Sequence, residues 1–337
     1  MLCPDDAILI RRINQLYHEL THDSFERVHR HRFSIQKPFW EYVARTLPAN
    51  RRAADYASKS LIVVDLACGT GFVSRTLGSY LAPTDRLIAI DLGEGQLRTT
   101  GRNWNSFRES RPQAPALVRL AGDIQTLPLT DESVDLVTIN AALHHMPDPM
   151  AVLREIDRVL RPGGKFALGF EPNRAHFASP VFSRLARGMD RLCWYANPRQ
   201  NRRRIRNLVG RLVGSPGRID ATLSFETGAA GRINEKLLRE KLIDRPLIAS
   251  RLLDLIDPHA RGEDRHTGFD PGALLGEALP GYRVLMLKTF DYLGETGRFF
   301  PAARNLADAA LRAIAPDGGS LFCWLLRKPY GETEPGS

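Results

Sequence analysis

The segment Asp65–Gly71 combines residue types that are typical of a nucleotide-binding turn. It follows the apolar run Leu61–Val64, which predicts a buried strand turning tightly into a helix. Gly69 and Gly71 can adopt backbone conformations closed to other residues and let a ligand approach the main chain. Asp65 disfavours a phosphate and favours a ligand amine. The segment therefore predicts a ligand that is nucleoside-like at one end and cationic at the other.

The acid and one missing glycine argue against a dinucleotide at this turn. The Gly-x-Gly-x-x-Gly fingerprint would place its third glycine at position 74, which is Ser74. A pyrophosphate at the helix start would also meet the negative charge of Asp65. An NAD-dependent oxidoreductase is therefore the weaker alternative, and the cofactor that raises the melting temperature would discriminate the two.

Three further segments follow the turn in order. Arg86–Asp91 predicts a strand ending in an acid twenty residues after Gly71, the spacing expected of a carboxylate that accepts from ribose hydroxyls. Ala121–Ile124 predicts an acid-tipped loop, and Ser133–Asn140 predicts a buried strand. Ala151–Gly164 predicts a helix and a turn before the next strand. The acids thus fall at the carboxyl ends of strands, where open parallel sheets bind their ligands.

In this order the four segments resemble the class I S-adenosylmethionine-dependent methyltransferases, especially the branch of quinone and small-molecule methyltransferases. The resemblance covers residues 60–171 closely. It implies an α/β fold, a doubly wound, mostly parallel seven-stranded Rossmann-like sheet, and S-adenosyl-L-methionine as the cofactor. It also implies direct in-line transfer of an activated methyl group, without a metal, to a nucleophile held in a dry site.

The resemblance also implies which residues hold the cofactor. Asp65 and the glycine backbone would hold the methionine part, and Asp91 would accept from both ribose hydroxyls. Leu92 would lie against the adenine ring, and Asp123 with the Ile124 amide would read its edge. The implied cofactor-binding residues are Asp65, Ala67, Gly69, Gly71, Asp91, Leu92, Asp123, Ile124 and Asn140, the last facing the sulfonium.

Two histidines just past the strand at 134–140 are candidates for a catalytic base. Imidazole in general titrates near neutrality, so His144 or His145 could take a proton from a hydroxyl or acidic carbon. A structural role in shaping the loop is the alternative, and both stay open. Further residues that could line the pocket are Tyr17, His18, His31, Glu171 and His176.

The spacing of apolar residues and the positions of turn residues divide the chain into parts. Alternating strand and helix patterns over residues 61–170 predict a parallel sheet with helices on both faces. Helical patterns at residues 5–20 and after Pro38 predict N-terminal helices. The expected parts are an N-terminal helical lid (1–50), the S-adenosylmethionine-binding domain (51–171 and 269–330), an inserted helical cap for the substrate (172–268) and a flexible tail (331–337).

Composition is that of a globular enzyme. The 337 residues are 43% hydrophobic, enough for a sizeable core. No stretch approaches the ~20 continuous apolar residues of a membrane helix, and the N-terminus lacks a signal peptide's order of charge and apolar core. We therefore expect a cytoplasmic protein. The four cysteines are scattered without a Cys-x-x-Cys pair, so neither a zinc site nor a disulfide framework is expected.

The net charge is +9, and the basic residues are spread over the chain except for one concentration of arginines at residues 199–212. At helical spacing these arginines surround an apolar stripe, which predicts an amphipathic basic helix. A solvated helix face is the simplest interpretation. Contact with an acidic substrate, with an anionic membrane surface or, least favoured, with RNA stays open.

The methyl acceptor is constrained mainly by exclusion. The strand at 134–140 is followed by Ala-Ala-Leu-His-His, not by the Pro-Pro-aromatic motif expected of enzymes that methylate base amines, and no cysteine stands there. This disfavours nucleic acid and favours a small, hydrophobic or amphipathic acceptor enclosed by helices. Transfer to oxygen, nitrogen or carbon stays open, as does the oligomeric state. A non-catalytic methyltransferase-fold partner subunit is the second competing interpretation.

Overall fold

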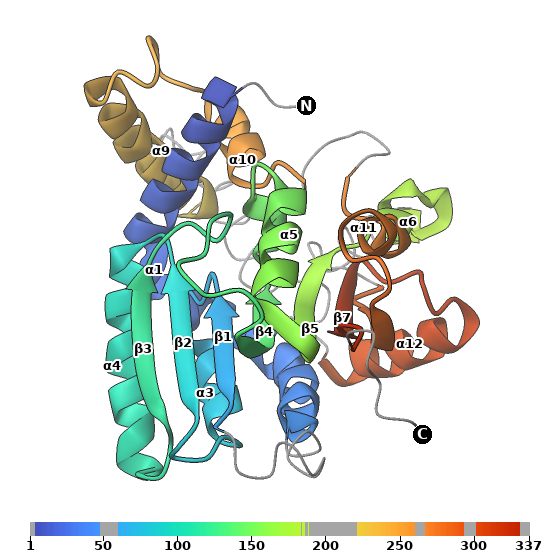
Figure 1. The fold of residues 1–337 in the computed structure, drawn as a ribbon. Helices are drawn as coiled ribbons and strands as arrows, with labels where there is room; N and C mark the ends of the chain where they lie inside the picture. Colours follow the sequence, from blue (N-terminus) through green and yellow to red (C-terminus); the bar gives the residue numbers. More distant parts are fainter. Residues whose placement is uncertain are drawn as a thin grey trace. The chain divides into compact units, whose positions relative to one another are not determined.

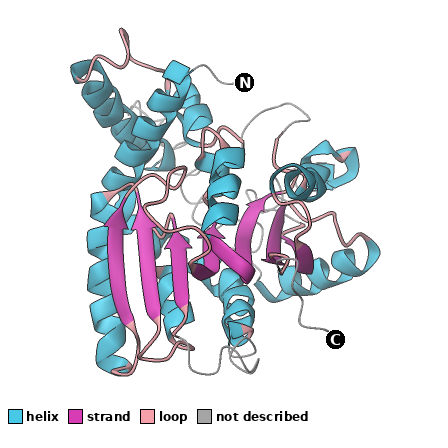
Figure 2. Ribbon diagram, viewed as in Figure 1, coloured by secondary structure: helices cyan, strands magenta, loops and turns pink. Residues whose placement is uncertain are grey.

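The computed structural model describes residues 4–47, 60–182, 184–185, 188, 221–259, 267–292 and 301–330, with the backbone alone described for 4–5, 23–31, 221–227, 301–305 and 307. The elements in chain order are α1 (Pro4–Arg45), β1 (Ile62–Leu66), α3 (Phe72–Gly78), β2 (Arg86–Asp91), α4 (Glu94–Ser110), β3 (Ala116–Ala121), β4 (Val134–Asn140), the 3₁₀ turn η2 (Leu143–His145), α5 (Pro149–Val159), β5 (Leu160–Pro172), α6 (Arg174–Ala178), α9 (Ala221–Arg239), α10 (Ala249–Ile256), α11 (Pro271–Ala278), β6 (Arg283–Phe290), α12 (Pro301–Ile314) and β7 (Leu321–Arg327). Figure 1 gives their arrangement, and Figure 2 distinguishes strands from helices. The basic segment at 199–212 and the tail at 331–337 lie outside the described residues.

The seven strands form one sheet in the order β3-β2-β1-β4-β5-β7-β6. β1 pairs in parallel with both β2 and β4, β2 pairs in parallel with β3, and β4 pairs in parallel with β5. The bonds between Gly163 or Gly164 and Lys328 join β5 to β7, which closes the far side of the sheet. The order moves outward from β1 in both directions, so the predicted doubly wound, mostly parallel seven-stranded fold is confirmed.

Side chains alternate between the two faces of the sheet, and helices cover both. Ile90 of β2 belongs to a buried cluster that includes Ile156 of α5. Its neighbour Ala89 points the other way and packs with Leu97 of α4. In Figure 1, α4 runs alongside β3 and β2, whereas α5 crosses β4 on the opposite face. The central strands are buried from both sides, which explains why their sequences are continuous apolar runs rather than alternating ones.

The N-terminal segment is one helix where the sequence pattern suggested two. α1 runs through Pro38, although proline cannot donate the backbone hydrogen bond of a helix interior. Burial of the next turn compensates for this loss, because Phe39, Trp40 and Val43 are at most 5% exposed. Proline at this position therefore leaves the helix continuous.

The described chain divides into two compact units. The first comprises Met1–Glu171, Phe269–Lys288 and Phe322–Ser337, and the second comprises Pro172–Gly268 and Thr289–Leu321. Inside the second unit, Asn173 donates to the carbonyls of Asp317 and Gly319 at 2.8 and 2.7 Å, which ties the chain after β5 to the turn before β7. Among the described residues, no helix is both long and apolar enough to cross a membrane.

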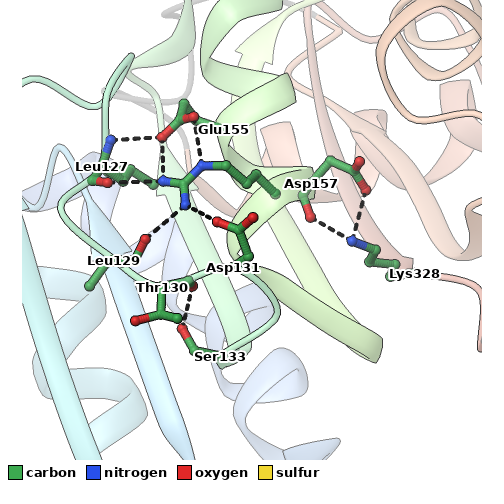
Figure 3. Close-up of polar contacts among 9 residues, drawn as sticks. Leu127, Leu129, Thr130, Asp131, Ser133, Glu155, Asp157 and Lys328 are labelled. Atoms are coloured by element: carbon green, nitrogen blue, oxygen red, sulfur yellow. Dashed lines mark hydrogen bonds and ion pairs between the residues drawn. The ribbon is translucent and has the colours of Figure 1, made fainter.

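One arginine organises the loop that connects β3 to β4. Arg158 of α5 donates to the carbonyls of Leu127 and Leu129 and pairs with Glu155 and Asp131 (Figure 3). Glu155 also accepts from the Leu127 amide at 2.8 Å. These bonds anchor the loop that begins directly after the predicted adenine-reading residues.

We expect Arg158→Met to lower the free energy of unfolding by about 2–3 kcal/mol, because two carbonyls and two carboxylates lose a charged donor. Urea unfolding measures the change. Arg154→Met on the same helix is the matched control, since Arg154 is 62% exposed and pairs with the exposed Asp148; its effect should stay within about 0.5 kcal/mol. Equal effects of the two substitutions would contradict this role of Arg158.

Candidate active site

The loop after β1 is held in a conformation that few residues adopt. Ala67, Gly69 and Gly71 have φ values of 48°, 55° and 78°. The Thr100 hydroxyl donates to the Gly69 carbonyl at 2.7 Å, and the Cys68 amide donates to the Ile90 carbonyl at 3.1 Å. The loop is thus fixed from β2 and α4 before any ligand binds.

Gly69 faces open space. A Cβ built on this residue would meet no atom within 4 Å, whereas one built on Gly71 would lie 2.9 Å from the Thr100 methyl carbon. The two glycines therefore have different structural roles. Gly71 is needed for packing against α4, and Gly69 leaves its main chain accessible at the position where the sequence predicts the methionine part of the ligand.

Asp91 ends β2 beside this loop. Its two carboxylate oxygens accept from the amides of Gly69 and Gly93 at 2.9 and 2.8 Å. The side chain is half-buried; burial raises its pKa, and the amides of Gly93 and Gly69 oppose that rise. Each carboxylate oxygen has two lone pairs, so both can still accept from a ligand hydroxyl. Asp91 is thus an oriented double acceptor next to the open face of Gly69.

Asp65 is more deeply buried than its position near the end of β1 suggested. It is 1% exposed, and its oxygens accept from the hydroxyls of Ser74 at 2.6 Å and Thr138 at 3.0 Å. The residue that replaces the third glycine of a dinucleotide fingerprint is therefore a partner of this carboxylate. Burial raises the pKa of Asp65 to about 6, although the two hydroxyls act to lower it. A contact between Asp65 and a ligand amine stays a prediction.

The raised pKa of Asp65 should make stability fall as the pH rises. Between its ordinary pKa of 3.8 and the folded value of about 6, the folded chain binds a proton that the unfolded chain releases. Between pH 4.5 and 7 the wild type should lose about 2 kcal/mol of unfolding free energy relative to Asp65→Asn. Urea unfolding of both proteins at the two pH values measures this difference, and parallel pH profiles would contradict it.

The predicted adenine-reading residues lie after β3. Asp123 accepts from the Gln125 amide at 2.9 Å through Oδ1, and its Oδ2 lies 3.3 Å from Nε of Arg11 on α1. The Gly122 amide donates to the Asp91 carbonyl at 3.1 Å, which joins this loop to the end of β2. Leu92 is 37% exposed, so apolar surface is available beside Asp91, whereas the Ile124 side chain is buried in the core. The Arg11 contact was not predicted from sequence.

Asn140 ends β4 and is oriented by α1. Its Oδ1 accepts from Nε1 of Trp40 at 3.1 Å, and its Nδ2 donates to Oε1 of Gln36 at 3.0 Å. A Cβ on Gly169 of β5 would lie 2.5 Å from the Trp40 ring, so only glycine lets the indole approach the strand. Asn140 is therefore held by residues about a hundred positions away, which no local pattern could have identified.

The two candidate bases form the short turn η2. Nδ1 of His144 lies 2.8 Å from Oε2 of Glu171, the buried acid in the last part of β5. The His145 ring packs edge-on against His18 of α1, with centroids 5.4 Å apart. His176 lies in the second unit, with Nδ1 2.8 Å from the Gly318 carbonyl. Of the other sequence candidates, Tyr17 packs edge-on against His18, and the His31 side chain lies outside the described residues.

Backbone strain gathers at the same edge of the sheet. Three non-glycine residues with positive φ follow or end neighbouring strands, namely Ala67 after β1, Ala141 after β4 and Phe170 in β5. Glu132, Lys241 and Asp291 are positive-φ residues elsewhere in the chain. Such conformations cost about 1–3 kcal/mol each and cluster at functional sites. Strain therefore marks the same edge as the acids.

This edge fits the implied cofactor. The register pairs Leu66 with Ile90 and with Ile139, and Asp91 with Ala121, so the ends of β1, β2, β3 and β4 lie together. Carboxylates suit ribose hydroxyls, an adenine amine and cationic groups. The open main chain at Gly69 provides the close approach, and the same carboxylates would repel a pyrophosphate.

Comparison with known proteins agrees with this fit. Residues 64–168 match the family model of the methyltransferase domain. A demethylmenaquinone methyltransferase of Lactobacillus johnsonii is 34% identical over 117 residues, which are 35% of this chain and 44% of that protein. A malonyl-(acyl-carrier protein) O-methyltransferase of Methylococcus capsulatus is 39% identical over 105 residues, 31% of this chain and 35% of the relative.

The family model and these two relatives each match about a third of the chain. With two further curated relatives included, the chain spans between 29% and 44% of the length of the proteins it matches. A solved S-adenosylmethionine-dependent methyltransferase from Aquifex aeolicus is 22% identical over 34% of this chain and 57% of its own, with a TM-score of 0.29. From residue 64 to residue 168, this chain is similar to methyltransferase domains, and its similarity to methyltransferases of known name covers about a third of its length.

Proposed function

We propose that the protein transfers the methyl group of S-adenosylmethionine to a small, hydrophobic or amphipathic acceptor. The observation that carries the proposal is the pairing of Asp91 with the open main chain of Gly69, joined by a 2.9 Å hydrogen bond. A double acceptor beside an accessible backbone suits a ribose with the methionine part next to it. Relatives named for demethylmenaquinone and for malonyl-(acyl-carrier protein) support a methyl acceptor outside nucleic acids.

Residues at the ends of different strands would contact different parts of the cofactor. Asp91 accepts from the ribose hydroxyls, and Leu92 covers the adenine face while Asp123 and the Ile124 amide read its edge. The remaining contacts, to the methionine and sulfonium parts, come from Asp65, Ala67, Gly69, Gly71 and Asn140. The bound cofactor supplies an activated methyl group, so the chain itself has to orient the acceptor, exclude water and accept a proton.

We assign the role of a lid to α1. Its residues reach three of the proposed cofactor loops: Arg11 pairs with Asp123, Gln15 donates to the Leu92 carbonyl at 3.4 Å, and Trp40 donates to Asn140. A helix with these contacts would keep water from the sulfonium and would have to shift for the cofactor to enter. The segment 172–268 stays our candidate for the acceptor-binding cap.

The base would be one of the two histidines of η2. His144 is the stronger candidate, because a buried carboxylate holds one of its ring nitrogens. His145 stays the second candidate, with its ring packed edge-on against His18 and tilted against His144. A neutral amine acceptor would need neither histidine as a base.

The proposal is tested by incubating the full chain with S-adenosylmethionine and a panel of small phenols, quinols, amines and carboxylic acids. Formation of S-adenosylhomocysteine that depends on one acceptor class supports the proposal and names that class. Tight binding of S-adenosylmethionine without turnover on the whole panel, together with a stable complex with a second methyltransferase subunit, would favour a non-catalytic partner role instead.

A further inference from the structure

Among the described residues, the hydrogen-bond partners of Glu171 all lie on one short turn. It is fully buried in the last part of β5. Its Oε1 accepts from the amides of Ala142 and Leu143 at 2.8 and 2.9 Å. Its Oε2 accepts from the His144 amide at 3.1 Å and lies 2.8 Å from Nδ1 of the same residue. One carboxylate thus fixes both the backbone of the turn and the ring of His144.

We propose that Glu171 is a positioning residue, which holds His144 in the tautomer with the proton on Nδ1, so that Nε2 presents its lone pair to the methyl acceptor. The inference rests on the proposed function and deepens it, because it assigns the proton-accepting atom. In the step itself, the acceptor's proton passes to Nε2, its electron pair forms the bond to the methyl carbon, and the electrons of the carbon–sulfur bond stay on sulfur.

The chemistry of the carboxylate decides the tautomer. Burial raises the pKa of Glu171, but the charge and hydrogen bond of His144 and the amides of Leu143 and Ala142 outweigh burial and bring the pKa below its ordinary value. An ionised carboxylate only accepts hydrogen bonds, so Nδ1 at 2.8 Å must be the donor. In neutral imidazole the other nitrogen then has no proton, and Nε2 is the basic atom.

A purely turn-shaping role would need the three amide bonds but not the bond to the ring. The Nδ1 atom of His144, 2.8 Å from Oε2 of Glu171, is the contact that such a role leaves unexplained.

The test is long-range ¹H–¹⁵N correlation spectroscopy of the full chain labelled with ¹⁵N-histidine, at a pH where imidazole is neutral. His144→Gln identifies the His144 signals by removing them. The wild type should show the Nδ1–H form at His144. In Glu171→Gln the new amide can donate to Nδ1, so the population should move to the Nε2–H form, and Glu171→Asp should retain the original form.

His176 is an internal control, because a backbone carbonyl accepts from its Nδ1. Its Nδ1–H signal should be the same in all variants. The proposal would be overturned if His144 of the wild type carried its proton on Nε2, or if it exchanged rapidly between the two tautomers. An unchanged tautomer in Glu171→Gln would overturn it as well. If Glu171→Gln does not fold, the wild-type spectrum and Glu171→Asp still decide the question.

Failure of this inference is distinguishable from failure of the proposed function, since the spectrum needs neither cofactor nor acceptor. With an acceptor identified by the turnover panel, Glu171→Gln should lower kcat roughly 10²-fold while the affinity for S-adenosylmethionine stays within twofold. Full turnover in Glu171→Gln with such an acceptor would also refute the positioning role.

Discussion

Asp91→Asn should bind S-adenosylmethionine about 30- to 1,000-fold more weakly than the wild type. Two charge-assisted hydrogen bonds to the ribose hydroxyls would be lost or weakened, at a cost of about 2–4 kcal/mol. The asparagine side chain also sets an amide donor against the N–H of Gly69 or Gly93, both of which donate to Asp91 in the native loop. Titration calorimetry with S-adenosylmethionine measures the change.

Asp85→Asn provides the matched control. Asp85 precedes β2 at the opposite edge of the sheet, is 3% exposed and also accepts from two backbone amides, those of Leu61 at 3.0 Å and Ala82 at 2.7 Å. It should lose a similar amount of stability and keep the wild-type affinity. Equal affinities for Asp91→Asn and the wild type would remove Asp91 from the site.

Gly69→Val is expected to abolish cofactor binding, with a loss of about 100-fold or more. A valine Cβ would enter the space around Gly69 that the ligand needs for its approach to the main chain. The substitution also strains a residue at φ 55°, which costs roughly 1–2 kcal/mol of stability in an L-residue. Calorimetric titration measures the affinity, and thermal unfolding measures the stability.

The strain and the steric effect can be separated with Gly281→Val. Gly281 has φ 78°, and a Cβ there would meet only the Pro329 ring at 3.7 Å, in ordinary contact. This variant should lose comparable stability while its affinity for S-adenosylmethionine stays at the wild-type value. A Gly69→Val protein that still binds the cofactor would show that the open face of Gly69 is not where the ligand lies.

Local patterns were sufficient for the strands that hold the site. The strands predicted at 86–91 and 134–140 coincide with β2 and β4, because a strand buried on both faces is an apolar run bounded by turn residues. Asp91, the acid at the end of the first run, then predicted a ligand-binding edge. A strand-to-helix turn with two glycines supported that prediction, since backbone conformation at Gly69 and Gly71 depends on few neighbours.

Contacts between distant segments were outside the reach of those patterns. The sequence placed Asp65 at a strand end but could not show that Ser74 and Thr138 surround it, since one partner comes from another strand. Trp40 and Asn140 are a hundred residues apart. Glu171 was only one of several acids and histidines considered for the pocket, and its hold on η2 follows from the pairing of β4 with β5.

The central claim is that this carboxyl edge of the sheet binds S-adenosylmethionine. Calorimetric titration of the full wild-type chain with S-adenosylmethionine, and separately with NAD, tests it most directly. We expect one-site binding of S-adenosylmethionine with a dissociation constant in the micromolar range, about −8 kcal/mol, and no heat of binding with NAD at the same concentrations. Binding of NAD without binding of S-adenosylmethionine would contradict the account.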